Sequence, residues 1–173
     1  PSWVISALRS ALELDGKQDQ LEQLLEANNE TPAVNLAALP NTSAAEYLTN
    51  QGLEPGGAAP TAFLAQGNPE NYLSTQGVRV QDQGSQLVAL ALLEVADKSG
   101  RWLDMCAGPG GKAAMLQAGI SPSGGVLDCL EPIPNRADLV RHALNPKLQA
   151  NVMVGYGQDA KAGFYDAVLL DAP

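Results

Sequence analysis

The sequence is poor in several residue types, and each scarcity narrows the range of functions. It contains two cysteines and one histidine among 173 residues. Two cysteines do not make a disulfide framework, and we predict no zinc site or Ser-His-Asp triad around the single His142. No apolar run approaches the roughly 20 residues that span a bilayer, and residues 1–16 lack the basic start of a signal peptide. We therefore expect a cytoplasmic globular protein with no metal and no membrane contact.

Basic residues are also scarce. The chain has 10 Lys and Arg against 19 Asp and Glu, which gives a formal net charge of −9. Residues 1–76 hold 2 basic and 9 acidic residues, and residues 77–173 hold 8 basic and 10 acidic residues. Proteins that grip nucleic-acid phosphates usually present a basic face. Any affinity for RNA is therefore expected to come from local patches or from sequence outside this chain.

Residues 101–118 read RWLDMCAGPGGKAAMLQA and predict a strand, a glycine-rich loop and a helix in succession. The apolar run ends at Asp104, and the loop holds Gly108, Pro109, Gly110 and Gly111. Glycines let the backbone approach a ligand closely and adopt positive φ angles, and the first N–H groups of the helix are free to face polar ligand atoms. This stretch is the predicted ligand site around which the chain is organised.

Two phosphate-binding loops can be tested against this stretch. A Walker A loop is excluded, because Cys106 stands where its first glycine is needed and Ala113 where its Ser or Thr is needed. A dinucleotide fingerprint is only partly excluded, since Ala113 also takes the place of its third glycine. The carboxylate of Asp104 would repel a pyrophosphate but attract a cationic amino-acid group. S-adenosylmethionine carries an ammonium and a sulfonium and no phosphate, so the balance favours it.

Two acidic residues stand at the ends of later predicted strands. The run 124–131 ends at Glu131, 20 residues after Gly111, where an acid can accept hydrogen bonds from both ribose hydroxyls of an adenosine. Residues 151–155 form a third predicted strand, and residues 165–173 a fourth with Asp171 at its end. The continuous apolar run of this fourth strand is typical of burial on both faces. Right-handed crossovers predict strand order 3-2-1-4 in a doubly wound sheet, with the ligand at the switch point between strands 1 and 4.

Three motifs in this order resemble those of a known family. Residues 80–86 (VQDQGSQ), 103–113 (LDMCAGPGGKA) and 169–173 (LLDAP) are similar to motifs of the RNA cytosine-C5 methyltransferases of the Sun/Nop2 class. Residues 1–3 (PSW) and 26–32 (EANNETP) also resemble landmarks of the region that precedes the catalytic domain in that family. The resemblance implies S-adenosylmethionine as cofactor and a cytosine in small-subunit (16S) ribosomal RNA as substrate and partner.

The resemblance also implies a set of site residues. Gln81 and Asp82 are expected beside the cofactor loop as residues of second rank. The family usually has Gly-Asp-Gly after the third strand, whereas this chain has Gly155, Tyr156 and Gly157, so either Tyr156 or Asp159 takes the place near the adenine. The predicted cofactor-binding residues are Cys106, Ala107, Gly108, Pro109, Gly110, Gly111, Lys112, Glu131, Asp159 and Asp171.

No catalytic residue is expected within the chain. Cytosine C5 becomes nucleophilic only after a thiolate adds to C6. In the family, one cysteine directly follows the Asp-Ala-Pro motif and the nucleophile lies further downstream, so both are expected beyond residue 173. Cys106 lies in the cofactor loop, where packing or a backbone contact is its expected role, and Cys129 is expected to be a buried thiol. The chain by itself is therefore predicted to be inactive.

The expected architecture is a small α/β subdomain at residues 1–76, which is a candidate RNA contact, followed by the first four strands of a Rossmann-like methyltransferase sheet at residues 77–173. Apolar spacing predicts helices at residues 2–14 and 18–27, with their apolar sides in packing roles, and a strand at 33–39. A helix at 41–52 is expected to begin with a capping box of Ser43 and Glu46, and Asp82 or Ser85 to cap the helix that follows.

Two other functions remain open from the sequence. A nicotinamide-dependent dehydrogenase is favoured by the glycine loop and Glu131, and opposed by Asp104 and the incomplete dinucleotide fingerprint. A non-catalytic cofactor-binding module is the third hypothesis. Titration with S-adenosylmethionine and with a nicotinamide dinucleotide would separate the methyltransferase hypothesis from the dehydrogenase hypothesis.

Overall fold

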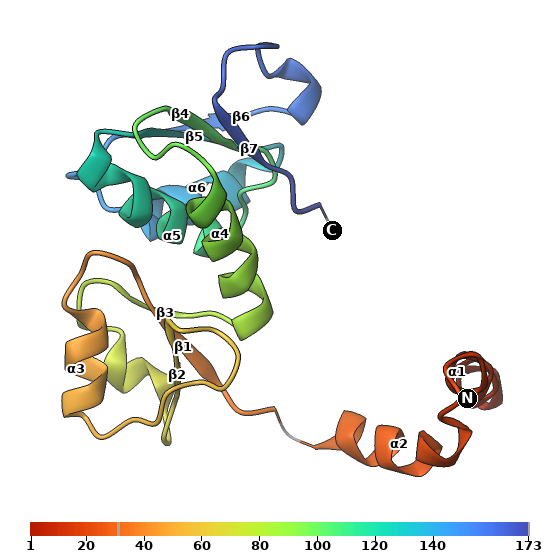
Figure 1. The fold of residues 1–173 in the computed structure, drawn as a ribbon. Coiled ribbons are helices and arrows are strands. Elements are labelled where there is room, and N and C mark those ends of the chain that lie inside the picture. The colour runs from red at the N-terminus through yellow and green to blue at the C-terminus, as the bar shows by residue number, and fades with distance from the viewer. Residues whose placement is uncertain (31, 173) are drawn as a thin grey trace. The chain divides into compact units, whose positions relative to one another are not determined.

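The structure is a computed structural model, and it describes residues 1–30 and 32–172 (Figure 1). The chain forms two compact units, residues 1–33 and residues 34–173. The regular structure described in the first unit is helical, and the second unit contains two β-sheets with their helices. Within the part of the chain that the structure describes, no helix is both long enough and apolar enough to cross a membrane.

The first unit consists of α1 (Ser2–Leu14), a 3-10 turn η1 (Gln18–Gln20) and α2 (Leu21–Asn29). The two predicted helices are confirmed, but neither contains a buried residue. Trp3 is 72% exposed and Leu14 is 90% exposed. The expected packing of the apolar sides is therefore not found within this unit, because two short helices offer too little surface to enclose a core.

The second unit begins with a small antiparallel sheet of β1 (Asn35–Ala38), β2 (Ala62–Leu64) and β3 (Val78–Val80) in the order β2-β1-β3. The connections carry α3 (Ala44–Asn50) and a 3-10 turn η2 (Pro69–Tyr72). Leu36, Leu48, Phe63 and Val78 are among the buried residues that form its core. The predicted domain boundary between residues 76 and 77 stays a prediction, but the strand directly after it belongs to this small sheet.

The predicted capping box of α3 is not formed. Ser43 occupies the N-cap position, but its side chain makes no capping hydrogen bond. The hydroxyl of Thr42 accepts a hydrogen bond from the Ala44 N–H at 3.2 Å instead, and it donates one to the Leu39 carbonyl at 2.7 Å. Ser43 has φ −80° and ψ 7°, whereas an N-cap residue that bonds back to the helix normally has extended geometry.

The large sheet contains β4 (Arg101–Asp104), β5 (Val126–Glu131), β6 (Ala150–Val154) and β7 (Ala167–Leu169). All neighbouring strands pair in parallel, in the order β6-β5-β4-β7. Along the chain this is the order 3-2-1-4, so the predicted Rossmann-like topology is confirmed. The connections contain α5 (Gly111–Ile120), η3 (Ser121–Ser123), α6 (Pro134–Ala143) and η4 (Gly157–Asp159), and α4 (Gln83–Val95) precedes β4.

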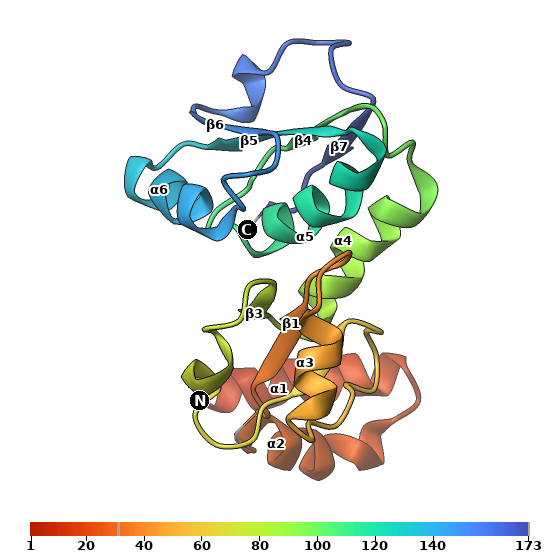
Figure 2. The same ribbon diagram turned by 90° about the vertical axis from the view of Figure 1, so that its left-hand side faces the viewer.

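In Figures 1 and 2, α4, α5 and α6 all lie on one face of the large sheet. Trp102, Leu127, Cys129 and Leu169 belong to the core cluster that these helices cover. The connection from β6 to β7, which lies nearer the other face, contains only η4 as regular structure. Val168 is accordingly 44% exposed, so the expectation that the fourth strand is buried on both faces is wrong. Pro173, the last residue of that predicted strand, lies outside the described residues.

Two glutamines fasten the small sheet to α4. The Gln83 side chain accepts hydrogen bonds from the N–H groups of Ala58 and Ala59 at 2.7 and 3.1 Å and donates one to the Asn35 side chain at 2.9 Å. Gln86 is fully buried; it accepts from the Thr61 hydroxyl at 2.7 Å and donates to the Gln81 carbonyl at 2.9 Å. Amide side chains therefore hold the junction between the small sheet and the first helix of the large-sheet layer.

We expect Gln86→Leu to lower the free energy of unfolding by about 1 to 3 kcal/mol, because it leaves buried partner groups without hydrogen bonds while keeping a side chain of similar size. Urea denaturation would measure this. Gln51→Leu, at an exposed position after α3, is the control. Equal stability of the Gln86 and Gln51 variants would show that the junction does not depend on the Gln86 amide.

Candidate functional site

The glycine loop connects β4 to α5 and fits tightly against neighbouring elements. Gly110 has φ 107°, and an added Cβ would lie 2.6 Å from the Ala143 Cβ of α6. At Gly108, a Cβ would overlap a carboxylate oxygen of Glu131. Both positions therefore require glycine. The reason is close packing within the protein, whereas close approach to a ligand was expected from the sequence. Gly110 contacts α6 and is not among the residues that line the cavity beside the loop, so its role as a cofactor-binding residue stays a prediction.

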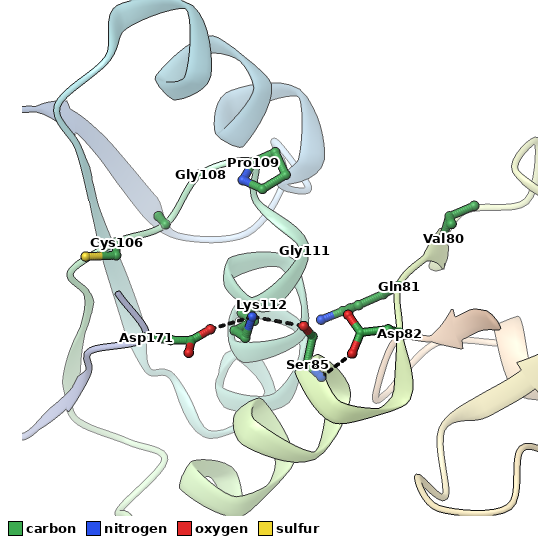
Figure 3. Close-up of a pocket in the computed structure, with 11 residues that line it drawn as sticks. Val80, Gln81, Asp82, Ser85, Cys106, Gly108, Pro109, Gly111, Lys112 and Asp171 are labelled. Carbon is green, nitrogen blue, oxygen red and sulfur yellow. Dashed lines mark hydrogen bonds and ion pairs between the residues drawn. The ribbon is translucent and has the colours of Figure 1, made fainter. Parts of the chain in front are cut away.

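A cavity of about 340 Å³ lies along the loop (Figure 3). It brings together three stretches that are distant in sequence: the end of β3 with the start of α4, the loop itself, and the segment after β7. Its lining residues are Val80, Gln81, Asp82, Ser85, Cys106, Ala107, Gly108, Pro109, Gly111, Lys112 and Asp171. Seven of the ten predicted cofactor-binding residues and both residues of second rank are in this set.

Lys112 links two of these stretches. Its ammonium forms an ion pair with Asp171 at 2.6 Å and donates a hydrogen bond to the Ser85 hydroxyl at 3.1 Å. The Ser85 N–H in turn donates to Asp82 at 2.8 Å, which makes Asp82 the cap of α4 and lowers the pKa of its carboxyl group. Figure 3 shows this chain of contacts along one side of the cavity. The sequence left Asp82 and Ser85 as alternative caps, and the structure selects Asp82.

Asp104 lies at the end of β4, beneath the loop, and is 2% exposed. One of its carboxylate oxygens, Oδ2, has no hydrogen-bond partner. Burial raises the pKa of Asp104 to about 6, while hydrogen bonding by the Cys106 N–H and the charge of Lys112 act against this shift. An acid that is buried, partly unpaired and close to a ligand loop is typical of functional sites.

Glu131 ends β5 as predicted and is 3% exposed. Its carboxylate accepts a hydrogen bond from the Ile133 N–H at 3.0 Å and lies 3.5 Å from the Arg136 guanidinium, which also donates to the Gly108 carbonyl at 2.8 Å. These contacts place the carboxylate directly against the glycine loop, on the side of the loop formed by β5 and α6.

A second cavity, of about 500 Å³, adjoins the first at Cys106. Its lining residues are Met105, Cys106, Pro132, Tyr156, Gly157, Gln158 and Leu170. Tyr156 is 65% exposed and lines this cavity. Asp159 lines neither of the two cavities; its carboxylate accepts the Tyr156 N–H at 2.8 Å and so caps η4. The structure therefore brings Tyr156, and not Asp159, to the cavity that continues from the loop.

The two cysteines differ in environment but share a raised pKa. Cys129 is fully buried in β5, and burial raises the pKa of its thiol strongly. Cys106 lines both cavities, and burial together with Asp104, Glu131 and Asp171 raises the pKa of its thiol. Both are free thiols. In the residues that the structure describes, no group of three His, Cys, Asp or Glu side chains is arranged to hold a metal ion.

A parallel 3-2-1-4 sheet with a glycine loop after its first strand and an acid at the end of its second is the topology of a Rossmann-like nucleotide- or cofactor-binding domain. Residues 90–173 match the model of the family described as 16S rRNA methyltransferase RsmB/F. The chain is also 38% identical, over 181 aligned positions, to "Putative methyltransferase MT1451" and "Putative methyltransferase Rv1407" from two strains of Mycobacterium tuberculosis. The alignment covers all of this chain and 39% of each relative.

Solved structures confirm the fold. The crystal structure of PH0851 matches all of this chain and 41% of that protein, with a TM-score of 0.73 and 20% sequence identity. A methyltransferase homolog protein from Pyrococcus horikoshii matches 90% of this chain and 55% of its own length, with a TM-score of 0.70 and 20% identity. At this level of identity the likeness establishes the architecture.

The raised pKa of Asp104 leads to a prediction about stability. The folded state binds a proton at this carboxyl more tightly than the unfolded chain does. The stabilisation that this protonation contributes to the free energy of unfolding is therefore fully present below about pH 4, and it is lost as pH rises through about 6. Asp104→Asn removes this proton linkage. Between pH 4 and pH 7, we expect the free energy of unfolding of the variant to rise by about 2 kcal/mol relative to that of the wild type, measured by urea denaturation at both pH values. A constant difference would contradict the burial argument.

Proposed function

We propose that this chain is the cofactor-binding part of an S-adenosylmethionine-dependent RNA methyltransferase that acts on C5 of a cytosine in small-subunit (16S) ribosomal RNA. The observation that carries the cofactor assignment is the placement of three acids, Asp104, Glu131 and Asp171, around one glycine loop. The chain spans about 39% of the length of the curated relatives it matches, so the activity concerns a longer protein.

The residues present fit this cofactor. The unpaired oxygen of Asp104 can accept a hydrogen bond from an ammonium group, and the Glu131 carboxylate at the end of β5 is suited to ribose hydroxyls. The apolar wall of the second cavity, formed by Met105, Pro132 and Tyr156, suits the adenine base. When bound, S-adenosylmethionine supplies an electrophilic methyl group on its sulfonium centre. The cluster of carboxylates favours such a cation and disfavours the pyrophosphate of a nicotinamide dinucleotide.

The chain's own cysteines support a nucleophile supplied from elsewhere. Attack on cytosine C6 requires a thiolate, and the raised pKa of both Cys106 and Cys129 keeps them protonated at neutral pH. Cys129 is in addition enclosed in the core. We therefore assign the covalent step to a cysteine outside this chain, and a cofactor-holding role to the residues around the loop. The cytoplasmic location expected from the sequence stays a prediction.

The ribose role of Glu131 is testable by substitution. Glu131→Ala is expected to weaken S-adenosylmethionine binding by about 1 to 3 kcal/mol, because ribose hydroxyls lose their acceptor in an enclosed position. The dissociation constant would be measured by calorimetric titration. Asp138→Ala, which removes an exposed carboxylate from α6, is the matched control. An unchanged dissociation constant for Glu131→Ala would remove this residue from the site.

The assignment of the nucleophile is tested by methyl transfer to unmodified small-subunit RNA with a tritiated cofactor. We expect no transfer from the 173-residue chain, and transfer from a longer protein that also contains the family's cysteine segment. In that longer protein Cys106→Ser should retain transfer, since Cys106 is assigned to the cavity wall. Transfer by the 173-residue chain, or loss of transfer in Cys106→Ser with cofactor binding intact, would overturn the assignment.

A further inference from the structure

Of the three glutamines in residues 80–86, two have complete structural roles and one does not. Gln83 and Gln86 use their side chains to hold the small sheet. Gln81 is held by its backbone: its N–H donates to the Asn35 carbonyl at 3.0 Å, and its carbonyl accepts from the Gln86 amide at 2.9 Å. Neither polar atom of the Gln81 side chain has a hydrogen-bond partner, although the residue is only 8% exposed.

The Gln81 amide lies beside the start of α5, in the wall of the first cavity. A Cβ placed on Gly111 would lie 3.4 Å from the amide carbon of Gln81 and 3.6 Å from its nitrogen. Figure 3 shows the side chain directed from the end of β3 toward Lys112. A buried amide without partners is unfavourable, and this one lies in the wall of a cavity, so a ligand that pairs with it would relieve that penalty.

The surrounding charges indicate which ligand group this is. The first N–H groups of α5 have no partner within the helix and carry partial positive charge, so they favour an anion beside Gly111. The Gln81 amide group can donate to the same anion. Asp171 lies on the other side of Lys112 in Figure 3, and Asp104 interacts electrostatically with both. The two carboxylates favour a cation near them. An anion next to a cation is the charge pattern of an α-amino acid.

We propose that the Gln81 side-chain amide binds the carboxylate of the amino-acid end of S-adenosylmethionine. This inference rests on the proposed use of that cofactor. It also gives the small sheet a role in cofactor binding, because the β1 strand and the Gln86 amide fix the Gln81 backbone. A nucleobase edge can pair with an amide too, but it lacks the negative charge that the N-terminus of α5 favours.

Two ligands that differ only in the amino-acid end make the test specific. S-adenosylhomocysteine carries the amino acid, and 5′-methylthioadenosine keeps the adenosine and thioether without it. We expect Gln81→Ala to raise the dissociation constant of S-adenosylhomocysteine about tenfold and to leave that of methylthioadenosine unchanged. The near-isosteric Gln81→Glu, which adds a negative charge opposite the carboxylate, should weaken S-adenosylhomocysteine binding at least as much.

Gln83→Ala is the matched control, since it removes a neighbouring amide that holds the small sheet but does not line the cavity. It should leave the ratio of the two dissociation constants unchanged. Equal weakening of both ligands in the Gln81 variants would make Gln81 a residue that shapes the cavity, and unchanged binding would remove it from the site. If the wild-type chain binds neither ligand, the proposed use of S-adenosylmethionine itself fails. This outcome is distinguishable from the two that concern Gln81 alone.

Discussion

The contact between the glycine loop and the end of β5 is the constraint on which the site depends. Gly108 lies so close to the Glu131 carboxylate that no side chain fits between them, and Arg136 ties the two together by contacting both. Because Gly110 packs against α6, the loop also fixes where α5 begins. The loop thereby sets the positions of Asp104 beneath it, Lys112 after it and the two cavities on its sides.

A second constraint comes from the small sheet. β3 leads directly into α4, and the amides of Gln83 and Gln86 hold this junction to β1 and to the connection between β1 and β2. The junction presents Gln81 and Asp82 to the cavity from the side opposite Asp171. A cavity wall built from two sheets in this way links the geometry of the ligand site to the packing of a subdomain that is distant from the loop in sequence.

Two buried polar side chains beside the loop lower the stability of the fold and are available to a ligand. Asp104 is buried with an unpaired oxygen, and Gln81 is buried with an unpaired amide, although hydrogen-bonded or apolar residues would fold more stably at both positions. Unsatisfied groups of this kind are rare in protein interiors and concentrate where a ligand completes them. Both of these lie against one loop, which is the strongest indication that the loop holds a ligand.

Local sequence patterns and the rules of chain topology were sufficient to predict several elements of the fold. The apolar period at residues 2–14 predicted a helix, the glycines predicted the loop before α5, and Glu131 predicted the end of a strand. The preference for right-handed crossovers predicted the strand order 3-2-1-4. The exposure of Val168 was not predictable from the local run, because burial of a strand face depends on which elements cover it. At the start of α3, the Thr42 hydroxyl accepts the hydrogen bond that was expected of Ser43, because the backbone angles of Ser43 are not those of a capping residue. Local sequence does not reveal these angles.

Which polar side chains are available to a ligand depends on contacts that form only in the folded chain. Gln81, Gln83 and Gln86 have the same side chain within six residues, and nothing local to the sequence distinguishes them. Their hydrogen bonds to residues some 25 to 50 positions away separate two structural amides from one that faces the cavity. Tyr156 and Asp159 were likewise alternatives for the place near the adenine, and in the folded chain the Asp159 carboxylate is engaged in the cap of η4. Hydrogen-bond satisfaction is a property of contacts between distant segments, and those contacts exist only once the chain has folded.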